Sequence, residues 1–311
     1  MADLHDPTVT VIIATYNRSE TLKTAIESVL DQDFGDFEVW VLGDACTDDS
    51  EAVIHSFQDT RLRWKNLPAN SGSQAQPNNE GLRLSRGKYL AYLGHDDLWL
   101  PWHLSGLIRY CEETGSDFVH SLCAMIGPHA ELRECIGPPR GNLTYRHSFV
   151  PPSCWLHRRE LVQTCGGWAD PNRLPMGVDF EYQRRIFASG AKMRFYPRLS
   201  VLKFKSEYFP GIYATRDDSI QVDYRRRITE SPTTLERDVL TEQAIAYARE
   251  RRGGDPPLRT ALAQVASVAL RRLRDFGMER WPLSAYLVWR WQRKRAATRA
   301  RRGLPPRAAV R

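Results

Sequence analysis

Two adjacent aspartates, Asp96 and Asp97, follow an alternating apolar stretch at 88–93 that predicts a buried strand. Pro101 comes shortly afterwards and is expected to begin a helix. Carboxylates at the carboxyl edge of a parallel sheet lie where such sheets bind ligands. Oxygen ligands of this kind suit Mg²⁺ or Mn²⁺, which would hold a diphosphate. The pair therefore predicts a metal site, and the alternative interpretation is a turn with a helix N-cap.

The N-terminal part of the chain alternates between patterns typical of strands and of helices. Short apolar runs predict strands, and amphipathic spacing predicts the helices between them. The expected strands span 8–14, 37–42, 61–66 and 88–93, a fifth is expected at 117–125, and the intervening helices begin near Ser19, Thr47 and Asn79. This alternation is typical of an α/β fold with a parallel sheet and right-handed crossovers.

From about residue 127 the alternation lapses, and glycine and proline pairs mark loops. Shorter elements are expected there, namely helices at 158–164 and 179–189 and strands at 193–196 and 200–204. Beyond about 230 the chain is expected to be helical, with an apolar stripe over 262–273.

The composition is that of a globular protein, with 42% hydrophobic and 26% charged residues among 311. The net charge of +7 is uneven, because 271–311 holds thirteen Lys and Arg residues against Asp275 and Glu279. The six cysteines show no Cys-x-x-Cys pair, and no signal peptide is apparent, so we expect reduced thiols and a cytoplasmic location. No apolar run approaches the ~18 residues that a membrane span needs.

Several chemically distinctive segments occur in a fixed order along residues 8–205. They are Thr15-Tyr16-Asn17-Arg18 after the first strand, Gly43-Asp44 with 47–50 after the second, 81–90 leading to Asp96-Asp97, Gly166-Gly167-Trp168, and 177–181. The order and spacing resemble those of the family-two glycosyltransferases, inverting enzymes with the GT-A fold. The resemblance implies a GT-A-type, mostly parallel sheet flanked by helices, with a helical C-terminal extension.

The resemblance also implies that three parts of the chain have different roles. Residues 1–126 would bind the nucleotide sugar, 127–230 would carry the acceptor-binding and catalytic half of the same domain, and 231–311 would form the basic helical extension. The reaction would move a sugar from a nucleotide-diphosphate donor, favoured to be a UDP-sugar, to a glycan or lipid-linked acceptor.

Asp44 matches the aspartate with which the family contacts the nucleotide base. Thr15, Tyr16 and Asn17 match the neighbouring loop, and Asp96 is also placed on the nucleotide sugar. A carboxylate can accept a hydrogen bond from a uracil imide, and the alternative role for Asp44 is a charge at a helix N-terminus.

The metal motif departs from the family pattern, because Gly94 stands where the family has its first aspartate. Asp96 matches the last acid, which is the family's direct ligand of Mg²⁺ or Mn²⁺, and Asp97 matches the acid after it. His95 is an alternative ligand, although imidazole suits Mg²⁺ poorly. A loop hydrogen bond is the other role open to His95.

Asp179 matches the family's general base, while Val178 replaces the preceding acid. Inversion needs one base to take the proton of the attacking acceptor hydroxyl. Glu181 is the competing candidate, although two residues along a helix it should point elsewhere. A plain N-cap is the structural alternative for Asp179, and Arg185 is expected to be structural.

The segment 127–175 is expected to select the acceptor. Trp155 and Trp168 offer flat apolar faces for a sugar ring, and burial in the core is the alternative interpretation for both.

The C-terminal residues 258–311 have two interpretations. The stripe and the following residues could cover the catalytic domain or form a dimer. Alternatively, the arginines with Trp281, Trp289 and Trp291 could attach the protein peripherally to an anionic membrane at the inner face of the cell. No specific nucleic-acid-reading motif is present, so arginines there would give only salt-sensitive attraction.

Two rival functions stay open. A nucleotidyltransferase would have a glycine-rich phosphate loop after the first strand, but 14–30 contains no glycine. A non-catalytic nucleotide-sugar-binding or assembly subunit is suggested by Gly94, and it would bind donor without turnover.

Overall fold

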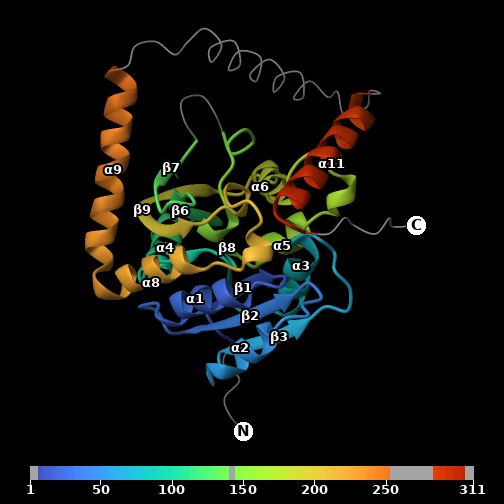
Figure 1. The fold of residues 1–311 in the computed structure, drawn as a ribbon, viewed down its shortest axis with the longest axis horizontal. Coiled ribbons are helices and arrows are strands. Elements are labelled where there is room, and N and C mark those ends of the chain that lie inside the picture. Colours follow the sequence, from blue (N-terminus) through green and yellow to red (C-terminus); the bar gives the residue numbers. More distant parts are fainter. Residues whose placement is uncertain (1–5, 140–143, 253–282, 305–311) are drawn as a thin grey trace.

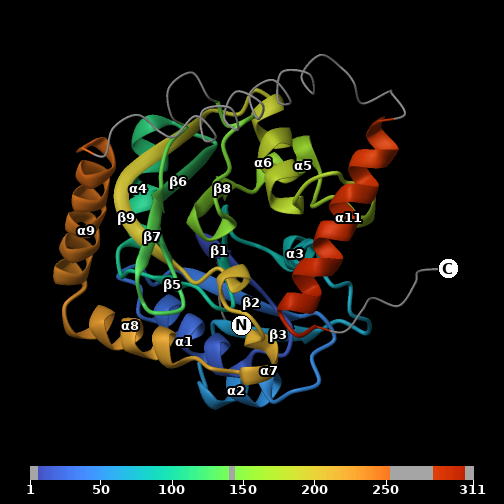
Figure 2. The same cartoon turned by 45° about the horizontal axis from the view of Figure 1, so that its top comes forward.

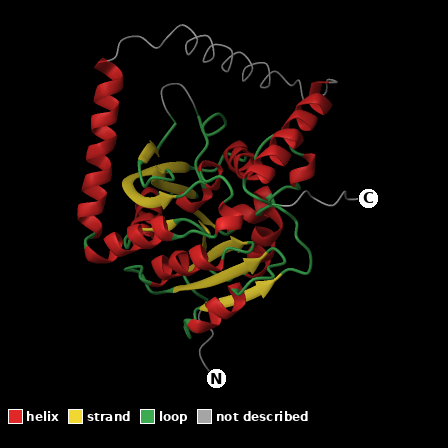
Figure 3. Cartoon of the chain, in the orientation of Figure 1, coloured by secondary structure: helices red, strands yellow, loops and turns green. Residues whose placement is uncertain are grey.

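The computed structural model describes residues 6–139, 144–252 and 283–304. Within these residues, nine strands form a single sheet in the order β3-β2-β1-β4-β8-β6-β9-β5, with β7 pairing on β6. Helices surround this sheet (Figure 3).

The first half of the sheet is parallel throughout, as the alternating pattern predicts. Its elements are β1 (Val9–Thr15), α1 (Ser19–Leu30), β2 (Phe37–Gly43), α2 (Ser50–Ser56), β3 (Leu62–Asn66), α3 (Ala75–Leu84) and β4 (Tyr89–Gly94). The strands β1, β2 and β4 are almost wholly buried, because both faces of a parallel sheet are covered. Since β4 returns to the other side of β1, the right-handed crossover rule places α3 on the opposite face from α1 and α2.

The second half of the sheet is mixed. Its elements are β5 (Leu98–Trp99), α4 (His103–Thr114), β6 (Phe118–Ile126), β7 (Leu132–Ile136), β8 (Trp155–Arg158), α5 (Glu160–Cys165), α6 (Val178–Ala188) and β9 (Met193–Lys203). The strand β8 runs antiparallel to both β4 and β6, and β9 runs parallel to β6. The expected fifth strand is confirmed as β6.

One continuous strand, β9, replaces the two short strands expected at 193–196 and 200–204. Its register against β6 shifts between the pairs Ser121–Tyr196 and Leu122–Leu199, so that Pro197 lies in the irregular stretch. Proline has no N–H to donate to a sheet, which accounts for a local bulge instead of a break in the strand.

The C-terminal helices differ in how they meet the body. They are α7 (Ile212–Thr215), α8 (Ser219–Glu230), α9 (Pro232–Arg252) and α11 (Leu283–Arg301). The start of α9 packs through Leu235 and Val239 into an apolar cluster with β5, β6 and β9, and the rest of the helix extends along one side of the molecule (Figure 1). On the opposite side, α11 lies near α3, α5 and α6 in both views (Figure 2). The expected stripe at 262–273, together with Trp281, falls outside the described residues.

The order of the strands fixes where a ligand can bind. Between β1 and β4 the chain changes direction across the sheet, because α1 leads from β1 to one side and α3 leads back to β4 on the other side of β1. In open α/β sheets, the crevice at the carboxyl ends of such neighbouring strands is the usual ligand site. Thr15, Asp44 and Asp96 all stand at this edge, since Thr15 ends β1, Asp44 follows β2 and Asp96 comes shortly after β4.

The Gly166–Trp168 loop is fixed on this framework by one side chain from α3. Asn79 accepts from the backbone N–H of Trp168 at 2.7 Å and donates to its carbonyl at 2.9 Å. A Cβ on Gly167 would lie 2.4 Å from the Asn79 oxygen, so glycine is required there by space. The loop in turn leads into the segment before α6.

We predict that Asn79→Ala lowers the free energy of unfolding by about 1–3 kcal/mol, because two buried backbone groups of Trp168 lose their partners. Urea denaturation measures the change. The matched control is Gln76→Ala, which removes an exposed carboxamide from the same helix and should leave the stability nearly unchanged. Equal stability losses in the two variants would contradict this role of Asn79.

Candidate active site

A cleft of about 400 Å³ opens at the carboxyl edge of β1, β2 and β4. It combines residues from the N-terminal half, from the segment before α6, from the end of β9 and from the C-terminal helix. The lining residues are Ala14, Thr15, Tyr16, Asp44, Asn70, Gly72–Gln74, Pro77, Gly94–Asp96, Pro171, Met176–Asp179, Lys203, Ser206, Glu207, Tyr213, Trp291, Lys294, Arg295, Thr298, Arg299, Arg302 and Leu304. The structure therefore brings Asp44, Asp96 and Asp179 to one cleft, although they are far apart in the sequence.

Asp44 lines the cleft and also holds the loop that forms one of its walls. Its carboxylate oxygens accept from the backbone N–H groups of Ser71 and Gly72, each at 2.8 Å. The Asp44 N–H donates to the carbonyl of Thr15 at 2.8 Å, which joins the ends of β2 and β1. Each carboxylate oxygen can accept more than one hydrogen bond, so a donor on a ligand can still be received.

Residues at the end of β1 and in the loop after it have two roles: some line the cleft, and one fixes the loop in place. Thr15 and Tyr16 line the cleft, and the buried Thr15 hydroxyl has no hydrogen-bond partner among the described residues. Asn17 does not line the cleft. Its oxygen accepts from the Thr47 N–H at 2.8 Å and its amide donates to the Thr47 hydroxyl at 3.2 Å, so it ties the loop after β1 to the loop after β2.

Asp96 and Asp97 differ sharply in their surroundings. Asp97 is fully buried, and its carboxylate accepts from Lys203 Nζ at 2.6 Å, from the Phe204 N–H at 3.1 Å and from the Ser153 hydroxyl. Asp96 lines the cleft, and no group in the described part of the chain donates a hydrogen bond to it. The expectation that Asp97 ligates a metal is therefore not supported, because its oxygens are used inside the protein.

Lys203 stays charged within this arrangement. Burial alone would lower the pKa of Lys203, but Asp97 and Asp96 outweigh burial, so the net shift is upward. Its ammonium group faces the cleft while it neutralises Asp97.

Gly94 fits the same cluster through its lack of a side chain. A Cβ at this position would lie 2.6 Å from Asp97 Oδ2 and 3.1 Å from Asp96 Oδ1. An aspartate here would thus require the Asp97 carboxylate to move. The neighbouring His95 lines the cleft with Nδ1 unpartnered among the described residues, and burial and Arg18 lower the pKa of His95 to about 3, so the imidazole is neutral.

The first turn of α6 separates the two candidate bases. Asp179 lines the cleft, and its oxygen accepts from the Phe180 N–H at 2.8 Å. Burial raises the pKa of Asp179 above its usual value. Glu181 instead receives Arg185 through two hydrogen bonds of 2.8 Å, and Arg185 also donates to the carbonyls of Cys165 and Gly167. Arg185 is therefore structural, as expected, and Glu181 is committed to it.

Trp155 and Trp168 belong to the core. They are 0% and 4% exposed, and their rings stack at 5.9 Å within an aromatic cluster that includes Tyr92 and Tyr182. Neither lines the cleft. The expectation that they contact an acceptor is wrong, because a buried ring presents no face to a sugar.

The C-terminal segment reaches the cleft, a position that the residue pattern did not predict. The described residues of α11 and the turn after it line the cleft from Trp291 to Leu304. Gly303, with φ of +81°, ends the helix and turns Leu304 back over it. The available signal was the excess of arginine over acidic residues in a helix that ends at a glycine. Packing against the catalytic domain, one of the two expectations for this region, is confirmed for α11.

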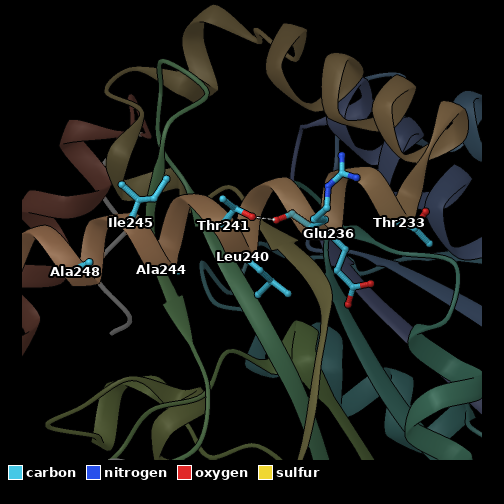
Figure 4. Close-up of a pocket in the computed structure, with 8 residues that line it drawn as sticks. Thr233, Glu236, Leu240, Thr241, Ala244, Ile245 and Ala248 are labelled. Carbon is cyan, nitrogen blue, oxygen red and sulfur yellow. Dashed lines mark hydrogen bonds between the residues drawn. The ribbon is translucent and has the colours of Figure 1, made fainter.

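Other candidate sites are weaker. A second hollow runs along α9, and side chains of that one helix line it (Figure 4). It is lined largely by apolar and threonine side chains, and none of the motif residues contributes to it. Within the described ranges, no cluster of three His, Cys, Asp or Glu side chains is placed to hold a metal ion, and no helix is both long and apolar enough to cross a membrane.

Comparisons with known proteins agree with this geometry. Residues 10–133 match the model of the family described as glycosyl transferase family 2. The chain is 32% identical over 114 residues to the UDP-Glc:alpha-D-GlcNAc-diphosphoundecaprenol beta-1,3-glucosyltransferase WfaP of Escherichia coli. That match covers 36% of this chain and 45% of the enzyme, so the chain spans less than half of this relative's length.

Two solved structures share the fold. Residues 1–349 of TarS from Staphylococcus aureus, in complex with UDP-GlcNAc, match with a TM-score of 0.54 and 20% identity over 64% of this chain and 58% of that one. The mannosyltransferase PcManGT from Pyrobaculum calidifontis, in complex with GDP-Man and Mn²⁺, matches with a TM-score of 0.52 and 18% identity over 94% of this chain and 88% of that one. Residues 10–133 therefore resemble a glycosyl transferase family 2 domain, and the chain shares the fold of TarS and PcManGT.

Proposed function

We propose that this protein transfers a sugar, with inversion, from a nucleotide-diphosphate donor to a glycan or lipid-linked acceptor. The observation that carries the proposal is the meeting of Asp44, Asp96 and Asp179 in one cleft at the topological switch point. Residues 1–126 then hold the nucleotide sugar, and 127–230 supply the base and the acceptor side. We place the nucleotide base against Asp44, Thr15 and Tyr16.

Asp179 is the proposed base. As the acceptor hydroxyl attacks the anomeric carbon, its proton passes to the Asp179 carboxylate, and the bond from that carbon to the diphosphate oxygen breaks. A raised pKa makes the carboxylate a stronger proton acceptor once it is deprotonated. Glu181 is unsuited to this role because Arg185 occupies both of its oxygens.

Asp96 is the proposed protein ligand of Mg²⁺ or Mn²⁺. Mg²⁺ is commonly held by one or two carboxylates together with the substrate's phosphates, so one carboxylate that receives no hydrogen bond from the described chain fits the ion. The unpartnered Nδ1 of His95 lies in the same cleft and suits Mn²⁺ better than Mg²⁺. When bound, the ion would neutralise charge on the diphosphate as it leaves.

The donor and acceptor classes rest on similar proteins. The name of WfaP specifies a UDP-glucose donor and a diphosphoundecaprenol-linked acceptor, and the TarS complex holds UDP-GlcNAc. These names favour a UDP-sugar donor and a lipid-linked or polysaccharide acceptor here. The alternative is a subunit that binds the donor without turning it over, and Gly94 is the feature that favours it.

We predict that Asp179→Asn retains nucleotide binding but lowers kcat about 100-fold or more, because an amide cannot accept the proton. Release of UDP from UDP-sugars in the presence of Mn²⁺ measures turnover. The matched control, Glu181→Gln on the same helical turn, should retain most activity. If Glu181→Gln were the inactive variant and Asp179→Asn stayed active, the assignment of the base would be wrong.

The pH profile tests the same residue. A base must be deprotonated to act, so wild-type kcat/KM should fall as pH drops through the pKa of Asp179. Because that pKa is raised, the fall should begin at a higher pH than an ordinary aspartate would give.

We predict that UDP binds more tightly with Mn²⁺ than with EDTA, and that Asp96→Asn removes most of this difference. Titration calorimetry on the full chain measures both affinities. Asp49→Asn, which neutralises an exposed aspartate outside the cleft, is the matched control and should behave like the wild type. Equal affinity for UDP with and without EDTA in the wild type would refute the metal assignment.

The outer face of α11 supports a peripheral membrane contact. Trp289 is 52% exposed, and Arg290 and Arg293 beside it are exposed as well. Tryptophan with arginine is typical of surfaces that lie at an anionic lipid interface. We propose that this face lies on the inner surface of the cell membrane.

We predict that the protein sediments with anionic liposomes and that binding falls with salt. The double variant Arg290→Gln/Arg293→Gln should weaken binding about tenfold or more, since each basic residue near such a surface contributes roughly 1 kcal/mol. Arg226→Gln/Arg237→Gln, which neutralises two exposed arginines of α8 and α9, is the control. If the protein bound neutral and anionic liposomes equally, the membrane contact of α11 would be refuted, and α11 would only pack against the rest of the protein.

A further inference from the structure

The C-terminal segment is attached to the rim of the cleft on both sides. On one side, Gln292 and Arg295 of α11 donate to the carbonyl of Pro171, at 3.2 and 3.0 Å. On the other side, the N–H groups of Gly211 and Tyr213 donate to the carbonyls of Arg301 and Arg302, at 2.8 and 3.2 Å. These contacts hold the end of α11 over the cleft.

The segment changes the charge of the cleft. Without it, the lining includes Lys203 and four carboxylates, those of Asp44, Asp96, Asp179 and Glu207. The segment adds four cationic side chains, Lys294, Arg295, Arg299 and Arg302. Since Lys203 already neutralises the buried Asp97, the added cations are what balance the carboxylates of the cleft.

Arg302 is the best placed of these cations. Its closest carboxylate is Glu207, at 3.8 Å from Nη2, and its Nε is buried without a hydrogen-bond partner in the described part of the chain. Burial acts to raise the pKa of Glu207, but Lys205, Arg302 and Lys294 outweigh it, so the net shift is downward. Arg302 lies beside Tyr213, whose backbone N–H donates to the Arg302 carbonyl at 3.2 Å, and both residues line the cleft together with Asp96.

A further cation lies behind Tyr213. Arg18 is fully buried, and none of its three guanidinium nitrogens has a hydrogen-bond partner among the described residues. Its guanidinium carbon lies 5.5 Å from the centre of the Tyr213 ring. Arg18 does not line the cleft, but its buried charge next to Tyr213 adds to the positive potential on that side of the cleft.

We propose that Arg302, with Arg299 and Lys294, completes the donor site by binding the diphosphate of the nucleotide sugar. This inference rests on the proposed function and extends it to the C-terminal segment. Planar guanidinium groups bind phosphate oxygens through paired, charge-assisted hydrogen bonds. As the bond from the sugar to the diphosphate breaks, the electron pair stays on the diphosphate oxygen, and Arg302 stabilises the added charge.

The test compares Arg302→Gln with Arg301→Gln in the full chain. The control removes the same charge from the neighbouring residue, which is exposed and does not line the cleft. Calorimetry in the presence of Mn²⁺ measures the affinity of each variant for UDP and for GDP. Ligand-observed NMR measures the affinity for the corresponding nucleoside, uridine or guanosine. We expect Arg302→Gln to bind the preferred diphosphate about tenfold more weakly and the nucleoside unchanged, because a charge-assisted bond to the diphosphate is lost.

Arg301→Gln should match the wild type, and Arg302→Lys should recover part of the affinity because it keeps the charge. Thermal unfolding of each variant is measured alongside. Unchanged diphosphate affinity in Arg302→Gln, or equal losses for diphosphate and nucleoside, would overturn the inference and leave the proposed function standing. Farnesyl diphosphate, a lipid diphosphate, is added as a competitor of nucleotide binding. If Arg302→Gln lost only this competition and kept its affinity for the nucleoside diphosphate, Arg302 would bind an acceptor diphosphate and the inference would be overturned. A wild type that binds neither UDP nor GDP would overturn the proposed function itself.

Discussion

The ion pair between Asp97 and Lys203 connects the two halves of the sheet at the point where the cleft forms. Asp97 follows β4, the last strand of the parallel half, and Lys203 ends β9 in the mixed half. Ser153, in the turn before β8, donates to the same carboxylate and accepts from the Gly94 N–H at 3.1 Å. A buried pair is stable only when its remaining bonding positions are filled, and here a hydroxyl and the Phe204 N–H fill them. Through this cluster, the carboxyl edge of β4 and the end of β9 hold one fixed arrangement.

That arrangement explains why two neighbouring aspartates have different roles. The side chain of Asp97 is drawn into the protein by Lys203, whereas Asp96 remains in the cleft. Gly94 leaves the room that the Asp97 carboxylate occupies. Residue 94 departs from the family pattern and Asp97 points inward. The two features are linked, because the inward position of Asp97 leaves no room for a side chain at residue 94.

The features that follow from local periodicity were predictable from the sequence. The strands β1, β2 and β4 have apolar runs that only a buried parallel sheet accommodates, and their order places Asp44 and Asp96 at one edge. The roles of Asp97, Trp155 and Trp168 were not predictable, because a residue pattern does not say whether a side chain after a strand turns toward the cleft or the core. Asp97 points inward because of Lys203 and Ser153, which are distant from it in the sequence. Trp155 and Trp168 point inward toward Tyr182, which is likewise separated from them along the chain. The position of α11 over the cleft likewise depends on long-range contacts with Pro171 and Gly211.

The charge balance of the cleft links Gly94 with the C-terminal arginines. By its resemblance to the family-two pattern, Gly94 stands where a carboxylate would contact ribose and metal-bound water, so this end of the cleft holds one acidic side chain fewer. In the same cleft, α11 and the turn after it add guanidinium groups to the lining that Asp96 and Tyr213 share. Both changes make this end of the cleft less negative, which favours a bound diphosphate directly. On the proposals above, fixed protein cations therefore carry a larger share of the leaving-group charge in this chain, and the metal ion carries a smaller one.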